Sequence, residues 1–188
     1  AFPTVCSALE LSHKSQIELL DKIRKIKGVK KVFIGSGIRY DLILEDKKDG
    51  SRYLRDIVEH HISGQMKIAP EHTEENVLNA MGKSHKYLIE FKREFYKLNK
   101  ETNKKQFLTY YFIAAHPGCD EIHMMKLKQF LKKELRLKPE QIQIFTPTPS
   151  TYSTLMYYTE KDPVSKKTIF VEKRLKNKRN QKEIITNN

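Results

Sequence analysis

The chain has few cysteines and no long apolar run, and each absence excludes a class of protein. Two cysteines cannot build a disulfide-rich secreted scaffold or a four-cysteine zinc site. No stretch approaches the ~18 consecutive apolar residues of a membrane-spanning helix. No secretory leader opens the sequence, which starts at Ala1 without a methionine. We therefore expect a cytoplasmic protein without membrane contact, whose chain is either processed or begins inside a longer one.

What the sequence does contain is positive charge and clustered apolar residues. Its 188 residues include 36 basic and 23 acidic ones, so the net charge is +13, and 38% of the residues are apolar. This length suits one domain with a real core. Residues 164–188 carry eight basic and two acidic side chains, or +6. That basic tail is either a solvated, frayed terminus or a contact for RNA, although beyond Phe170 it lacks the aromatic side chains on which single-stranded bases stack.

Helical and strand patterns alternate along the chain. Apolar residues at helical spacing predict helices, and short β-rich runs predict strands. The expected helices cover residues 17–27, 51–62, 73–81, 84–99 and 120–135; the expected strands cover residues 31–35, 65–69, 107–115 and 141–145, with a hairpin near residues 162–163. Strands separated by helices imply parallel pairing with right-handed crossovers.

The spacing of the four expected strands limits the architecture. Their centres lie near residues 33, 67, 111 and 144, which gives steps of 34, 44 and 33 residues. An eight-stranded βα barrel uses about 31 residues per unit and about 250 in all, so a closed barrel is excluded by length. An open α/β sheet of about four parallel strands fits, as does a partial (half) βα barrel with flanking helices.

Polar residues follow each expected strand, where active sites of parallel sheets form. The loop Gly35–Gly37 is either part of a site or only a tight turn. Arg39 follows directly on the first strand and is suited to clamp a carboxylate through two parallel hydrogen bonds. Glu71 and His72 follow the second strand as a carboxylate–imidazole pair for binding or proton transfer, or as a surface turn. Lys67 lies within that strand, at an edge or facing a polar barrel interior. The remaining candidates are Ser36 in the first loop, His116 after the third strand and Thr146 after the fourth.

Several catalytic motifs are missing. The chain has no Gly-x-Ser-x-Gly nucleophile elbow, no His-Glu-x-x-His zinc helix and no dinucleotide or Walker fingerprint. Cys6 and Cys119 are two thiols, whereas an iron–sulfur cluster needs about four ligands.

At the strand ends the sequence resembles a known family. The matching segments are residues 32–41 (VFIGSGIRYD), 67–73 (KIAPEHT), 77–83 (VLNAMGK), 111–118 (YFIAAHPG) and 145–149 (FTPTP). Together they resemble the YgiQ-type uncharacterised radical SAM proteins, over about residues 2–171. The pattern is similar, more faintly, to the radical SAM methylthiotransferases.

The resemblance implies a radical SAM enzyme, in which a [4Fe–4S] cluster cleaves S-adenosylmethionine to a 5′-deoxyadenosyl radical that abstracts hydrogen from a substrate of unknown identity. The family's Cys-x-x-x-Cys-x-x-Cys loop is absent from this sequence. The resemblance therefore places residues 13–152 in the C-terminal half of the barrel, residues 1–12 in the end of an upstream insertion, and residues 153–188 in a C-terminal extension with the basic tail. The partner would be the missing N-terminal half, and this chain alone would be inactive and prone to self-association.

The resemblance also suggests roles for the strand-end residues. Glu71 or His72 would bind the ribose of S-adenosylmethionine, and Arg39 or Lys67 its carboxylate. Residues 113–116, with His116, and 145–147, with Thr146, would flank the adenine. Cys6 is either an extra cluster ligand or a free thiol. Two rival interpretations stay open: a basic α/β module that binds RNA through its tail, and a small complete enzyme that uses Glu71, His72 and His116 without a cluster.

Overall fold

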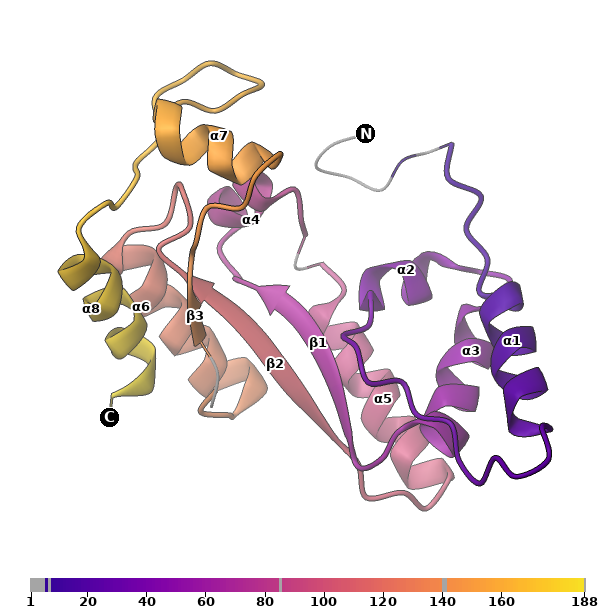
Figure 1. Ribbon diagram of the computed structural model, residues 1–188. Coiled ribbons are helices and arrows are strands. Elements are labelled where there is room, and N and C mark those ends of the chain that lie inside the picture. The colour runs from indigo at the N-terminus through magenta and orange to yellow at the C-terminus, as the bar shows by residue number, and fades with distance from the viewer. Residues whose placement is uncertain (1–5, 7, 85, 140–141, 188) are drawn as a thin grey trace. The chain divides into compact units, whose positions relative to one another are not determined.

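Helices alternate with the strands of one sheet in the computed structural model, which describes residue 6 and residues 8–84, 86–139 and 142–187 (Figure 1). Among these residues the sheet has three strands, in the order β1 (Gln65–Glu71), β2 (Phe107–Ala114) and β3 (Ile142–Ile144). β2 and β3 are parallel, with Phe112 opposite Ile142 and Ala114 opposite Ile144. The chain is thus a mixed α/β protein with an open parallel sheet and flanking helices.

The strand expected over residues 31–35 is not present in the structure. The backbone N–H of Ile34 donates to the carbonyl of His61, and that of Ile38, just after the segment, donates to the carbonyl of Lys67, each at 3.0 Å. Ile38 forms one isolated parallel bridge with Ile68. Gly35 and Gly37 offer no side chain to pack and weaken a strand. The fourth strand is therefore reduced to a bridge, and a four-stranded half barrel is not confirmed.

The chain divides into two compact units, which are not continuous in sequence. Unit 1 comprises Ala1–Ser7, Pro70–His85 and Tyr110–Asn188, and unit 2 comprises Ala8–Ala69 and Lys86–Thr109. β1 and β2 each contribute residues to both units, because the division falls within the two strands.

Unit 2 is built on helices around an aromatic core. Its helices are α1 (Lys14–Arg24), α2 (Tyr40–Glu45), α3 (Gly50–Asp56), continued by the π-helical turn η1 (Ile57–His61), and α5 (Leu88–Glu101). In α5 the buried residues Leu88, Phe91, Phe95 and Leu98 recur at steps of three and four, which places them on one face. Tyr40 of α2 meets Phe91 with ring centroids 5.6 Å apart. α2 was not predicted from the sequence.

Unit 1 contains the ends of β1 and β2, all of β3 and four helices. These are α4 (Glu75–Met81), α6 (Glu121–Phe130), continued by the π-helical turn η2 (Leu131–Leu135), α7 (Tyr152–Thr159) and α8 (Leu175–Thr186). α4 ends at Gly82, whose φ of 68° is the left-handed conformation favoured after a helix. The predicted hairpin is present as a tight turn, closed by an antiparallel bridge between Lys161 and Thr168.

The basic C-terminal segment forms α8, so the expectation of a frayed tail is wrong. α8 packs against α6 and β3 (Figure 1). It buries Lys178, Gln181 and Ile185, of which two are polar. The sequence pattern did not predict this buried face of α8, because Lys178 and Gln181 are polar and form no apolar stripe along the helix. α7 was also not predicted.

Within the described part of the chain, no helix has the length and apolar character needed to cross a membrane.

Candidate functional site

β1 and β2 end in the same unusual way. The last residue of β1, Glu71, has φ 63°, and Ala115, which follows β2, has φ 58°. Both are non-glycine residues in the left-handed region, where a side chain is strained by about 1–3 kcal/mol. Each is followed by a buried histidine, His72 or His116. The two strand ends thus turn sharply and direct an imidazole into the interior of unit 1.

His72 lies at the centre of a buried polar network. Its Nδ1 accepts a hydrogen bond from the backbone N–H of Glu74 at 3.0 Å, so the neutral ring carries its proton on Nε2. Nε2 lies 3.6 Å from Sγ of Cys119. Burial, followed by the charges of His123 and His116, lowers the pKa of His72 to about 3. His72 is therefore neutral at physiological pH and serves as a fixed donor to sulfur.

His116 has the opposite tautomer. Its Nδ1 donates to the carbonyl of Pro117 at 2.8 Å, which leaves Nε2 to accept from the hydroxyl of Ser153, also at 2.8 Å. Burial lowers the pKa of His116 to about 4, although the bond to Pro117 opposes this effect. The ring also meets Phe145 edge to face, with centroids 5.0 Å apart. α7 and the loop after β2 are thereby joined through a neutral imidazole.

Glu71 lies beside these histidines in a half-buried charged group. Its Oε1 accepts from Nζ of Lys83 at 2.6 Å. Burial, and then the charge of Glu71, raises the pKa of Tyr111 on β2. Thr73 follows His72, and its buried hydroxyl has no hydrogen-bond partner among the described residues. An unsatisfied buried hydroxyl costs free energy, so Thr73 adds an unfavourable contribution at the turn that holds His72.

Cys119 and Gln181 complete the network. The side-chain Oε1 of Gln181 accepts from the backbone N–H of Ala115 at 3.0 Å, and its Nε2 donates to the carbonyl of Cys119 at 3.2 Å. Sγ of Cys119 lies 3.6 Å from Oε1 of Gln181. Burial raises the pKa of the Cys119 thiol to about 12, so it is not a thiolate at neutral pH. Gln181 therefore fixes α8 to the turn that holds His116.

The predicted site residues of the first loop lie in unit 2. Ser36 and Arg39 line a cavity of about 360 Å³, together with Gln16, Leu19, Leu20 and Tyr53. Arg39 donates to both carboxylate oxygens of Asp41, at 2.9 and 2.6 Å. A ligand carboxylate would have to compete with Asp41 for this guanidinium. Lys67 is exposed on β1, and its carbonyl accepts from Ile38.

Thr146 and Cys6 take no part in the buried network. Thr146 is exposed after β3, and its hydroxyl lies 3.4 Å from the carbonyl of Ile144. Cys6 is exposed. No group of three or more His, Cys, Asp or Glu side chains in the described residues is placed to hold a metal ion. The two thiols of the chain do not supply the ligands that a [4Fe–4S] cluster requires.

The sequence therefore indicated part of the site. Glu71, His72 and His116 belong to one unit, as strand-end residues of a parallel sheet should. Ser153 and Gln181 were missed because they lie 37 and 66 residues from their partners His116 and Ala115. Lys83 falls within one of the family-like segments, and that was the only sequence signal for it.

Fold and site together define a parallel α/β protein whose polar groups converge where β1 and β2 end. Residues 140–187 match a family model described as a domain of unknown function (DUF3362). Nearly the whole chain is similar to proteins named UPF0313, the designation of the YgiQ-type family. The resemblance to YgiQ-type proteins is thus supported, whereas the names of these relatives describe no activity.

Three relatives illustrate the extent of the similarity. A UPF0313 protein of Fusobacterium nucleatum is 60% identical over 186 residues, which cover 98% of this chain and 33% of the relative. A UPF0313 protein of Clostridium botulinum is 45% identical over 185 residues, 98% of the chain and 28% of the relative. A UPF0313 protein of Clostridium perfringens is 42% identical over 184 residues, which cover 97% of this chain and 27% of the relative. The chain therefore spans about a third or less of these relatives' length, and no solved structure matches it.

Proposed function

We propose that this chain is part of a radical SAM enzyme that cleaves S-adenosylmethionine at a [4Fe–4S] cluster. The observation that carries the proposal is the pair of strained strand ends at Glu71 and Ala115, each followed by a buried histidine. Strain of this kind persists where the surrounding structure over-determines it, and it clusters at ligand and active sites. The motif resemblance and the similarity to UPF0313 proteins support the same assignment.

The cluster itself does not fit the residues of this chain. Cys6 is exposed, Cys119 is a buried neutral thiol beside His72, and the described residues hold no larger ligand group. The proposal therefore places the cluster ligands in the remainder of the longer protein. S-adenosylmethionine would supply the radical chemistry when bound, and this chain would bind and orient it.

The residues at the end of β1 fit a ribose. Glu71 presents a half-buried carboxylate, which is an acceptor for sugar hydroxyls, and the Thr73 hydroxyl has no partner in the described residues. Lys83 holds the Glu71 carboxylate in place through a 2.6 Å contact. Neutral His72 and His116 fix the turns behind these groups without adding charge. The proposed role of this chain is thus to position the nucleoside part of the cofactor.

Glu71→Gln in the full-length protein tests this role. A hydrogen bond to a charged group contributes about 1.5–3 kcal/mol, so we expect the dissociation constant for S-adenosylmethionine, measured by calorimetry under anaerobic conditions, to rise about tenfold or more. Glu75→Gln is the matched control, because Glu75 is exposed in the first turn of α4 and has the same chemistry. Equal affinities of both variants would refute the role of Glu71.

The enzyme assignment has its own test. Protein purified without oxygen should contain iron and sulfide and should consume S-adenosylmethionine when a reductant is added. Protein that lacks iron after reconstitution, or that leaves S-adenosylmethionine intact, would refute the proposed function.

A further inference from the structure

Unit 1 contains a cavity of its own, distinct from the unit 2 cavity that Ser36 and Arg39 line. None of the residues that line it belongs to the turns that hold His72 and His116. Its volume is about 570 Å³, within the range of ligand-binding pockets. α6 and η2 form one wall, the segment that follows η2 forms another, and the C-terminal end of α8 closes it. The floor is apolar and includes Leu131 and Ile185, which are 2% and 3% exposed. The cavity is therefore anchored in the packed core of unit 1.

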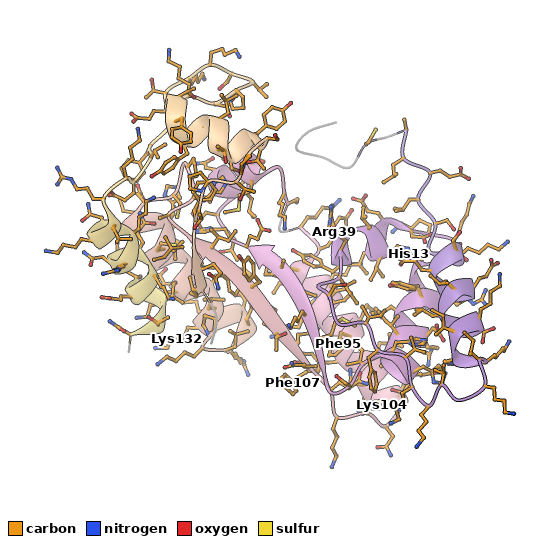
Figure 2. All side chains as sticks on the ribbon, in the orientation of Figure 1. His13, Arg39, Phe95, Lys104, Phe107 and Lys132 are labelled. Atoms are coloured by element: carbon orange, nitrogen blue, oxygen red, sulfur yellow. The ribbon has the colours of Figure 1, made fainter. Side chains whose placement is uncertain are left out.

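Among the described residues, the charged side chains that line this cavity are all basic. Lys128, Lys132, Arg136 and Lys138 contribute four cations, and no acidic side chain lines it among the described residues. Figure 2 shows Lys132 on the side of the molecule that carries α6 and α8. Nζ of Lys128 donates to the carbonyl of Asn187 at 2.9 Å, which connects α6 to the end of α8. Clustered cations over a concave apolar surface raise the local concentration of anions.

Arg136 occupies its place at a cost to the fold. It caps η2 with φ 53° and ψ 43°, the left-handed conformation in which glycine is the favoured residue. A charged side chain is thus retained at a position where glycine would be more stable.

We propose that this cavity binds the phosphate groups of single-stranded RNA. Four cations match the phosphates of a single strand, and the apolar floor offers a base an aliphatic contact in place of the aromatic stacking that many single-strand binders use. α8 also carries two exposed basic side chains, Lys176 and Arg179, which add positive charge to unit 1. An acidic peptide would satisfy the charges but leave the floor uncovered, and a duplex is too wide to enter a cavity of this size. The site differs from the basic tail expected from the sequence, because most of its cations come from α6, η2 and the segment after them.

The test measures the binding of a fluorescently labelled single-stranded RNA 12-mer to the full-length protein by anisotropy. We expect Lys132→Glu combined with Arg136→Glu to raise the dissociation constant at least tenfold. The matched control is Lys104→Glu combined with Lys105→Glu, which makes the same charge change at exposed lysines of unit 2 (Figure 2). We expect less than a threefold change in this control. Equal losses in both variants would overturn the proposal, because they would show attraction to the overall positive charge.

A second variant keeps the test valid if the double variant does not fold. Arg136→Gly removes one charge and suits the left-handed backbone, so it should weaken RNA binding about threefold or more while it raises the melting temperature. It should also reduce the slope of log K against log salt by about 0.7, the value for one phosphate contact on a single strand. An unchanged slope would overturn the proposal. So would competition by polyglutamate, or by duplex RNA, as effective as that by unlabelled single-stranded RNA.

Discussion

Replacing Gln181 with methionine is expected to destabilise the protein by about 2–6 kcal/mol. Gln181 is 1% exposed, and its amide bonds the backbone N–H of Ala115 and the carbonyl of Cys119. Methionine has a similar length and fills most of the same volume, so the change removes hydrogen bonds without opening a large cavity. Each buried group left unsatisfied costs about 1–3 kcal/mol, and two such groups give the stated range.

Two measurements check this prediction. The melting temperature should fall by roughly 4–24 °C, since 1 kcal/mol shifts it by about 2–4 °C in a protein of this size. Hydrogen–deuterium exchange should increase at the Ala115 amide, because the Gln181 side chain is its hydrogen-bond acceptor. Faster exchange at Ala115 would report directly on the contact between α8 and the turn after β2.

Asn180→Met is the matched control for the Gln181 variant. Asn180 is the preceding residue of α8 and is exposed, so its replacement should change stability by less than about 0.5 kcal/mol. If the Gln181 and Asn180 variants melted at the same temperature as the unmodified protein, and exchange at Ala115 stayed slow, the argument that Gln181 fixes α8 would be refuted.

Two further predictions concern unit 2. Burial alone would raise the pKa of Asp46, but the backbone N–H of Asp49 and the side chain and backbone N–H of His13 outweigh it and lower the pKa to about 2. The ionised carboxylate should stabilise the fold by about 2 kcal/mol above pH 3.8, and this stabilisation should be lost as the pH falls through about 2. Measuring the free energy of unfolding against pH should show this loss. The Asp46→Asn variant should not show it. Gly50→Ala should lower the free energy of unfolding, measured in urea, by about 1–3 kcal/mol, because the added Cβ would lie 2.0 Å from the carbonyl oxygen of Ile43. The control is Gly35→Ala, whose Cβ meets no atom within 4 Å and should cost little. Equal stability of the two alanine variants would contradict the steric argument.

Elements with a strong local pattern were predicted from the sequence. β2 and α5 follow directly from runs of β-branched and aromatic residues and from the three-and-four spacing of Leu88, Phe91 and Phe95. α2 was missed because six residues carry too little periodicity to distinguish a helix from a loop. α8 was predicted as a tail because its buried face uses Lys178 and Gln181, which find partners in Tyr157 and Cys119. Such partners are set by tertiary packing and leave no local signal.

The same distinction applies to the candidate site. The sequence predicted that Glu71, His72 and His116 follow the strands, because the order of strands and helices fixes where the carboxyl ends lie. It did not predict the proton positions. His72 and His116 follow similar strand ends, yet one accepts at Nδ1 and the other donates from it. The acceptor or donor that each ring meets, Glu74 N–H or the Pro117 carbonyl, comes from the conformation of the turn and not from residue type.

The turns at Glu71 and Ala115 are also positions where the backbone conformation is unfavourable for the residue present. Glycine at position 115 would remove the left-handed strain, and the sequence uses glycine for that purpose at Gly82 and Gly118, whose φ angles are 68° and 88°. The strand ends at Glu71 and Ala115 instead hold non-glycine residues; Glu71 carries a carboxylate, and the backbone N–H of Ala115 donates to Gln181. At Glu71 the side chain itself is the group that a ligand would meet. At Ala115 the rigid turn serves to hold His116 in place. Strain at both strand ends is thus consistent with a site whose geometry has to be fixed before a ligand arrives.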